Sequence, residues 1–227
     1  MGLVLALAAG SIAACGSNSD NGKEGATLTV LNYGKYIDED AVKQFEKETG
    51  IKVKYEEYES PEEMYTKYKA GSIDYDVICS SEYMVEKLIN EGEVLQMDYA
   101  GMENYKNLDP TIIDMSSAYD KDHNYSLPYF YGTLGLLYNK TEVDPSVVKS
   151  WDCLWDPTYE DEIIMENSVR DTFAPALIDL GYSLNETDET HLREALDVLK
   201  KQKDDKIVYG YYVDETADAM IGEEALI

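Results

Sequence analysis

The amino-acid sequence predicts an α/β fold in which parallel strands alternate with helices. Short runs of β-branched and apolar residues recur between longer segments whose apolar residues have helical spacing. The helical segments start at capping residues, and several of them end at glycine. Because a helix separates most strands from the next, neighbouring strands are expected to run parallel and to be joined by right-handed crossovers.

The first half of the chain contains three predicted strand–helix units. Ser60, Pro61 and Glu63 have the capping-box spacing that opens a helix, with proline at its first position. Gly50 and Gly92 supply helix ends, because glycine readily adopts the left-handed conformation needed there. The strands are expected at 26–32, 51–55 and 76–79, and the helices at 38–48, 60–70 and 82–90.

The second half begins after a change in composition between residues 126 and 139. The apolar residues 134–138 indicate a linking strand that carries the chain out of the first domain. The last three residues open a strand, so the chain is expected to be cut short within its second domain. Beyond a short helix that opens at 150–152, strands are expected at 163–165, at 207–209 and from Glu224, and helices at 170–180, 188–203 and 214–221.

The N-terminal residues have the pattern of an export signal followed by a lipid attachment site. Residues 3–14 form an apolar run that is too short to span a bilayer as a helix, and Cys15 follows small residues at its end. This order resembles a bacterial lipobox, whose cysteine thiol receives a diacylglycerol. The alternative, a buried cysteine at a strand end, fits poorly with the polar tether that follows. The positively charged start of a signal is missing, which indicates that the sequence begins late.

The expected organisation follows from these signals. It comprises a signal-peptide remnant (1–14), the lipidated Cys15 with its tether (15–25), a first α/β lobe (26–131) and a second α/β lobe (132–227). The first lobe is expected to be incomplete without a returning C-terminal segment. We therefore expect an exported protein that is anchored by lipid on the outer face of the cytoplasmic membrane or is periplasmic.

The overall charge makes some partners improbable and favours others. The chain has 46 acidic and 19 basic residues, a formal net charge of −27. Such a chain repels nucleic acid and anionic lipid headgroups and attracts cations, although solubility alone would also explain the acidic surplus. Tyrosine dominates the aromatic residues, with 20 Tyr against 2 Trp and 3 Phe. It offers both a flat ring and a hydroxyl group.

Motifs for catalysis or metal binding are not recognisable in the sequence. His123 and His191 stand alone, without the spacing of zinc ligands. Cys79 and Cys153 have the surroundings of small buried residues rather than of a disulfide framework. There is no nucleophile elbow, metalloprotease motif or phosphate loop. We therefore predict no catalytic residues, no metal ligands and no cofactor.

Polar and aromatic residues follow three of the predicted strands, at 32–36, 80–83 and 166–171. Ligands of open parallel sheets bind beyond the carboxyl ends of the strands. Each serine taken alone is explained by helix capping, and Asp171 by its interaction with a helix dipole. The recurrence of these residues with tyrosines at three strand ends favours a binding site.

This mixture of residues fits a cleft for a linear diamine. Tyrosine rings surround the methylene groups and the positive charge, and carboxylates pair with the ammonium ends. Two alternatives stay open. A ferric site would use oxygen donors such as Tyr211 and Tyr212, the only adjacent tyrosine pair. A lipid-anchored hydrolase would use paired acids, but solvated helix faces also explain the abundant carboxylates.

Several longer motifs, in collinear order along nearly all of the chain after the tether, are specific to polyamine-type binding proteins. They occupy 32–36, 45–53, 58–65, 107–110, 125–129, 150–155 and 180–188. In these motifs the chain resembles the spermidine/putrescine-binding proteins of bacterial ABC importers. The resemblance implies a two-lobe periplasmic-binding-protein fold, type II-like, that clamps a polyamine between its lobes. The second lobe and the return to the first are expected to be truncated here.

The resemblance also implies roles for individual residues. Tyr33 takes the place of an aromatic residue, usually tryptophan, that packs on the ligand. Tyr36, Ser81 and Tyr83 match residues that contact the ligand. Asp171 matches the acid, typically glutamate, that grips an amino group.

Two positions depart from the family pattern and leave the preferred polyamine open. Ser168 stands where well-known members carry aspartate. Glu82 stands where others have threonine, and it either supplies the lost charge or faces solvent. The implied partners are a polyamine and the membrane permease subunits of an ABC importer. We expect a monomer that is not an enzyme and does not bind nucleic acid.

Overall fold

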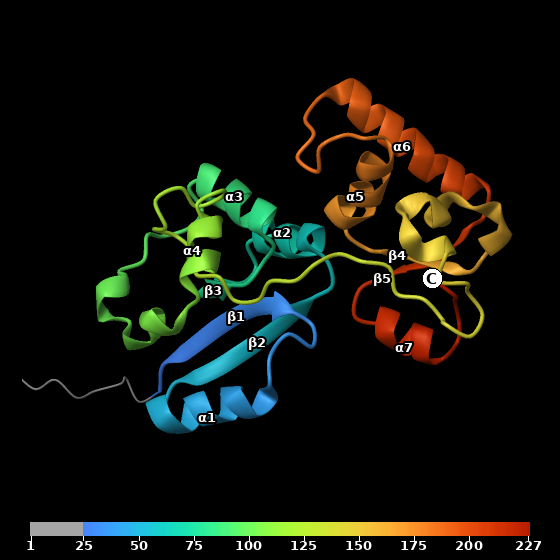
Figure 1. Cartoon of the computed structure of the whole chain (residues 1–227). Helices are drawn as coiled ribbons and strands as arrows, with labels where there is room; N and C mark the ends of the chain where they lie inside the picture. The colour runs from blue at the N-terminus through green and yellow to red at the C-terminus, as the bar shows by residue number, and fades with distance from the viewer. Residues whose placement is uncertain (1–24) are drawn as a thin grey trace, which may run out of the picture.

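The computed structural model describes residues 25–227 and contains two parallel sheets within that range (Figure 1). The predicted signal-peptide remnant, Cys15 and the tether up to residue 24 lie outside the described residues. The first sheet has the strand order β2-β1-β3, and the second pairs β4 with β5. Every strand pair is parallel, which confirms the predicted α/β class.

The first sheet and its helices form one unit, which we call the N-lobe. β1 and β2 pair over their whole length, from Thr27 opposite Lys52 to Tyr33 opposite Tyr58. The core of this lobe consists of the buried residues Leu31, Tyr58, Met64, Met84 and Leu88. The elements are β1 (Thr27–Tyr33), α1 (Glu39–Thr49), β2 (Lys52–Tyr58), α2 (Pro61–Lys69), β3 (Val77–Ile78), α3 (Glu82–Asn90) and α4 (Pro110–Ser116), with short 3-10 turns at Tyr99–Gly101 and Glu103–Asn107.

The helix ends of the N-lobe follow from the sequence signals. Asp38 caps α1 by accepting a hydrogen bond from the Asp40 N–H at 2.9 Å. Gly50 ends α1 in the left-handed conformation, with φ 72°. Ser60 caps α2 through the Glu63 N–H at 3.2 Å. The Glu63 carboxylate bonds the N–H of the preceding Glu59 instead of that of Ser60, a variation on the predicted capping box.

The second sheet and its helices form the C-lobe, which has the larger core. β4 and β5 pair from Ile163 opposite Val208 to Glu166 opposite Tyr212. Helices α5 and α6 pack on this sheet, and the buried core includes Ile163, Met165, Leu177 and Leu199. The elements are β4 (Ile163–Glu166), α5 (Val169–Asp179), α6 (Glu189–Asp204), β5 (Val208–Tyr212) and α7 (Thr216–Ile221), preceded by 3-10 turns at Val147–Lys149, Trp151–Trp155 and Pro157–Tyr159.

The linking strand predicted within residues 126–139 is not a strand in the structure. This segment crosses from the N-lobe to the C-lobe in extended form (Figure 1). A strand requires a neighbouring backbone to complete its hydrogen bonds, and Leu137 is well exposed rather than packed in a sheet. At the end of the crossing, the Asn139 N–H donates to the Leu226 carbonyl oxygen at 2.9 Å.

The strand predicted from Glu224 is also not formed as such, although the last residues lie along β4. The Leu226 N–H donates to the Glu162 carbonyl oxygen, and the Ile164 N–H donates to the Ile227 carbonyl oxygen, both at 2.8 Å. Ile227 is buried in the core of the C-lobe. These few bonds are too short a ladder to count as a strand. The domain bounds 26–131 and 132–227 stay a prediction.

Candidate functional site

The carboxyl ends of β1 and β3 bring two of the predicted site residues together. The Tyr33 and Ser81 hydroxyl groups lie 2.6 Å apart and share a hydrogen bond. Ser81 precedes α3 at its capping position, yet its side chain makes no capping bond. The Ser81 hydroxyl therefore forms a hydrogen bond with Tyr33 and not with the backbone of α3. This argues against helix capping as the main role of Ser81.

Tyr33 belongs to a cluster of aromatic side chains on the N-lobe whose rings pack at tilted or edge-on angles. We call Tyr33, Tyr36, Tyr58, Tyr129 and Phe130 the aromatic cluster. The Tyr33 ring centre lies 5.1 Å from that of Tyr36 and 4.5 Å from that of Tyr58. The Tyr36 ring meets Phe130 edge-on at 5.3 Å, and Phe130 lies 4.2 Å from Tyr129. Burial raises the pKa of Tyr33, so its hydroxyl stays neutral at physiological pH.

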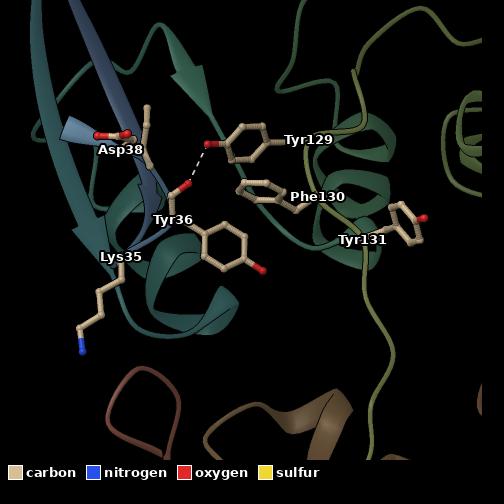
Figure 2. Close-up of a pocket in the computed structure, with 7 residues that line it drawn as sticks. Lys35, Tyr36, Asp38, Tyr129, Phe130 and Tyr131 are labelled. Carbon is tan, nitrogen blue, oxygen red and sulfur yellow. Dashed lines mark hydrogen bonds between the residues drawn. The ribbon is translucent and has the colours of Figure 1, made fainter. Parts of the chain in front are cut away.

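Part of this cluster lines a cavity of about 480 Å³ where the crossing segment meets the loop after β1. Figure 2 shows Tyr36, Tyr129 and Phe130 grouped together, while the Tyr131 ring points away from them. The Tyr129 hydroxyl donates to the Tyr36 carbonyl oxygen at 2.7 Å and so fixes the crossing segment to this loop. Lys35 points away from the aromatic rings (Figure 2).

Lys35 contacts the C-lobe. Its Nζ lies 3.4 Å from Asp218 Oδ2 and 3.4 Å from the Asp214 carbonyl oxygen. A Cβ at Gly34 would lie 2.2 Å from Asp214 Oδ2, so the absence of a side chain permits this close approach. Burial raises the pKa of the Asp214 carboxyl group. The positive charge of Lys35 lowers this pKa, and the negative charge of Glu57 raises it further.

Another contact between the lobes surrounds Tyr83. The Tyr83 hydroxyl donates to Glu62 Oε1 at 3.1 Å, and the Arg170 guanidinium of the C-lobe lies 5.8 Å from the centre of its ring. Arg170 Nε lies 3.6 Å from Glu82 Oε1. A cavity of about 410 Å³ at this boundary is lined by Tyr83, Glu62 and side chains of α5 and α6. Burial and the Glu62 carboxylate raise the pKa of Tyr83, and the neighbouring Ser168 hydroxyl opposes the shift.

The C-lobe contributes carboxylates beside this contact. Ser168 is buried and caps α5 by accepting a hydrogen bond from the Asp171 N–H at 3.4 Å. Asp171 lies in the first turn of α5, and Glu166 is the last residue of β4. Burial, followed by repulsion from Asp171, raises the pKa of Glu166 to about 6. Among residues 25–227, neither carboxylate forms an ion pair with Lys, Arg or His.

The structure thus groups most of the predicted site residues in two places. Tyr33, Tyr36 and Ser81 lie on the N-lobe, and Tyr83 borders Ser168 across the lobe boundary, with Asp171 one turn further along the chain. Glu82 faces Arg170 in an ion pair instead of standing free. Their assignment to a ligand remains a proposal. Sequence reasoning overlooked three neighbours of these residues, namely Tyr129, Phe130 and Asp214. It placed Glu166 in a strand-end stretch but did not include it among the predicted site residues.

Only some of these neighbouring residues could have been recognised as site residues from the sequence. The aromatic run 129–131 in a segment between the lobes was visible and could have suggested a binding role. Glu166 lies in the same strand-end stretch as Asp171, but its burial depends on how that stretch turns. Asp214 is brought to the site by the packing of the two lobes, which the sequence does not encode locally.

The structure does not support a ferric site at the adjacent tyrosines. Tyr211 and Tyr212 are successive residues of β5, so their side chains leave opposite faces of the sheet. The Tyr212 ring folds back over Gly210, where an added Cβ would lie 2.8 Å from it. Across residues 25–227, no group of three or more His, Cys, Asp or Glu side chains is arranged to hold a metal ion. Cys79 and Cys153 are both free.

No helix in the part of the chain that the structure describes has the length and apolar composition needed to cross a bilayer.

Comparisons with known proteins agree on one family. The profile of a family described as bacterial extracellular solute-binding protein matches residues 40–226. The spermidine/putrescine-binding periplasmic protein of Escherichia coli K12 is 38% identical over 198 residues, which cover 86% of this chain and 56% of that protein. The putrescine/cadaverine-binding protein of Pseudomonas aeruginosa PAO1 is 37% identical over 174 residues, covering 74% of this chain and 49% of that one.

A solved structure of a related protein also superposes on this chain. A Listeria monocytogenes chain described as a spermidine/putrescine ABC transporter superposes with a TM-score of 0.80 at 36% identity, covering 88% of this chain and 61% of that one. The chain spans about half the length of the curated relatives it matches. With a family profile over most of its length and relatives above 30% identity, the chain belongs to the bacterial extracellular solute-binding protein family.

Proposed function

We propose that the whole protein is the substrate-binding component of an ABC importer and captures putrescine or spermidine between its two lobes. The observation that carries the proposal is the aromatic cluster of the N-lobe together with the Glu166 and Asp171 carboxylates of the C-lobe, which lack cationic partners among residues 25–227. The names of relatives above 30% identity, which refer to spermidine, putrescine and cadaverine, support the same ligand class.

A polyamine matches this arrangement chemically. Its methylene groups and charge can lie against tyrosine faces, each well-placed cation–π contact contributing roughly 0.5–2 kcal/mol. Its ammonium ends can donate charge-assisted hydrogen bonds to carboxylates, worth about 1.5–3 kcal/mol each. The hydroxyl groups of Tyr33 and Ser81 are uncharged and could form further hydrogen bonds with the ligand.

The proposed ligand site contains the seven residues predicted from the sequence. They are Tyr33, Tyr36, Ser81, Glu82, Tyr83, Ser168 and Asp171. Two lobes at 26–131 and 132–227 would enclose it, with permease subunits of the importer as partners of the closed form. We further propose a monomeric protein without enzymatic activity, exported and anchored by lipid on Cys15.

Isothermal titration calorimetry on the full-length protein tests this function. The titrants are putrescine, spermidine, a neutral amino acid, maltose and ferric ion. Saturable heat with putrescine or spermidine is expected. Absence of polyamine binding, or saturable binding of maltose alone, would reject the proposal. A coloured tyrosinate complex with ferric ion, without polyamine heat, would favour the iron alternative.

A further inference from the structure

We propose that Gly34 and Asp214 form a closure seat, in which the Asp214 side chain of the C-lobe packs on the backbone of Gly34 when the lobes close on the ligand. Both are positioning residues in this role, because they set how far the lobes approach and leave ligand contact to other side chains. The inference rests on the proposed function, since it concerns closure of the two lobes around a polyamine.

Gly34 is a fixed point on the N-lobe. It directly follows β1, and its N–H donates to the Tyr58 carbonyl oxygen at the end of β2, at 3.3 Å. Gly34 is also buried, although it lies in the loop after the strand. The neighbouring strand therefore holds its backbone in place beside Tyr33 of the aromatic cluster.

Asp214 reaches this point from the other lobe, in the turn between β5 and α7. A Cβ built on Gly34 would lie 2.2 Å from Asp214 Oδ2 and 3.4 Å from Asp214 Cγ. Atoms that are not bonded to each other do not approach to 2.2 Å. Asp214 therefore occupies the space that any other side chain at position 34 would need.

The backbone conformation of Gly34 does not by itself require glycine. Gly50 and Gly181 have φ angles of 72° and 76°, in the left-handed region that favours glycine, whereas Gly34 lies outside that region. Alanine is thus compatible with the backbone at position 34. What glycine provides here is space for the opposite lobe.

Charge does not explain why Asp214 lies so close to Gly34. Glu57 Oε2 is 4.0 Å from the same Cβ position, so two acids from different lobes approach one point. Lys35 offsets this repulsion only in part, because its Nζ bonds the Asp214 carbonyl oxygen and the Asp218 carboxylate, each at 3.4 Å. Lys35 and Asp218 are well exposed, and such pairs contribute little. The approach therefore depends on shape.

A side chain at position 34 would hold the lobes apart or force Asp214 aside. Either response costs free energy in the closed form and none in the open form, where the two residues are separated. A ligand that is held by the closed form binds more weakly when that form is less populated. A substitution at Gly34 should therefore weaken binding without removing a ligand contact.

The test compares variants of the full-length protein by small-angle X-ray scattering, calorimetry and thermal melting, with putrescine as the ligand. Gly34→Ala and Gly34→Val are the main variants. Gly101→Ala is the matched control, because no atom of residues 25–227 outside its own turn lies within 4 Å of the added Cβ. We expect putrescine binding to weaken by about tenfold in Gly34→Ala and by more in Gly34→Val. Both should have a larger putrescine-bound radius of gyration than the wild type and Gly101→Ala.

A second substitution separates lobe closure from local damage. Asp214→Ala removes the carboxylate that the new side chain would meet, so that no atom outside the neighbouring residues is closer than Glu57 Oε2 at 4.0 Å. The double variant Gly34→Ala with Asp214→Ala should regain the wild-type radius of gyration and most of the putrescine affinity. A loss of affinity or melting temperature that Asp214→Ala does not reverse would mean that residue 34 acts on the N-lobe alone, and would overturn the proposal.

The remaining outcomes also decide between the two proposals. If the wild type binds putrescine and both Gly34 variants bind it equally well with unchanged scattering, there is no closure seat and the polyamine function still stands. If the wild type binds no polyamine, the proposed function fails. The scattering of the ligand-free variants then decides the closure seat: expansion in Gly34→Ala that reverts in the double variant supports it, and unchanged dimensions reject it.

Discussion

Arg170 of the C-lobe lies across the lobe boundary from Glu82, with its Nε 3.6 Å from Oε1 and its guanidinium 5.8 Å from the centre of the Tyr83 ring. One side chain thus contacts both predicted site residues of α3. Arg170 also bonds the Asn185 side chain, which holds it in place from its own lobe. The contact favours the arrangement in which the lobes are close together.

The first prediction concerns this contact. Removing the guanidinium in Arg170→Ala should favour separation of the lobes, because an exposed ion pair and a cation–π contact together contribute about 1–2 kcal/mol. We expect a larger radius of gyration in small-angle X-ray scattering of the ligand-free full-length protein, and binding weakened by about three- to tenfold. Lys200→Ala, which removes the exposed pair of Lys200 with Asp197 along α6, is the control. Unchanged scattering in both variants would show that Arg170 does not hold the lobes together.

A second prediction assigns Asp171 to ligand charge recognition. Asp171 is exposed in the ligand-free structure, so only a bound ligand and the closed lobes would remove water from it. Neutralising one partner of a charge pair that is desolvated in this way costs roughly 2–5 kcal/mol. Asp171→Asn should therefore weaken polyamine binding by about 30-fold or more in the full-length protein. Asp197→Asn, an exposed acid on α6, should leave binding unchanged. If Asp171 only favours its helix dipole, Asp171→Asn lowers the melting temperature slightly and leaves calorimetric affinity intact.

Tyr83 provides the third prediction. Tyr83→Phe keeps the ring and loses one hydroxyl, so binding should weaken by about 1 kcal/mol. Tyr83→Ala also removes the ring that faces Arg170, so it should cost more. The matched control is Tyr68→Phe, whose hydroxyl likewise bonds a glutamate, Glu93, away from the lobe boundary. Equal affinities for Tyr83→Ala and wild type by calorimetry would remove Tyr83 from the site.

The elements that the sequence predicted well are those with local signals. The helix predicted at 82–90 is observed as α3 (Glu82–Asn90), and the cap at Ser60 opens α2 as expected. Capping residues and helix-ending glycines act through their own neighbours, so they can be recognised without knowing the fold. The linking strand at 126–139 failed because strand formation depends on a distant partner backbone.

The site was predictable only in part for a similar reason. The rule that ligands bind beyond strand ends led to Tyr33, Ser81 and Ser168. Tyr129 reaches the loop after β1 from 93 positions along the chain, where its hydroxyl meets the Tyr36 carbonyl oxygen. Contacts across that separation are set by packing of the two halves. They carry no periodic signal in the sequence.

The fourth prediction concerns export and anchoring. If Cys15 is lipidated, Cys15→Ser should release the exported full-length protein from the membrane fraction. A diacylglycerol attached to the thiol inserts two acyl chains, and burial of each methylene contributes about 0.8 kcal/mol to membrane attachment. Cys153→Ser is the control, because Cys153 is buried within the C-lobe. Membrane retention of Cys15→Ser in cell fractionation would reject lipidation at this position.

The fifth prediction follows from the pKa of Glu166, which burial and Asp171 raise to about 6 from an ordinary 4.5. Between these values the folded, ligand-free protein holds a proton that the unfolded chain has lost. Glu166 therefore stabilises the fold most below pH 4.5, and this contribution is lost as the pH rises through 6. A ligand ammonium favours the ionised carboxylate, so polyamine binding near pH 6 should release a proton.

Calorimetry in two buffers of different ionisation enthalpy measures that proton directly. Wild-type affinity should fall as the pH is lowered from 7.5 to 5, because ligand and proton then compete for the same carboxylate. Glu166→Gln has no such proton to release, so its binding should depend less on pH. Its thermal stability should also lack the loss that the wild type shows between pH 4.5 and 6. Identical pH profiles for the two proteins would mean that Glu166 does not titrate in this range and does not meet the ligand.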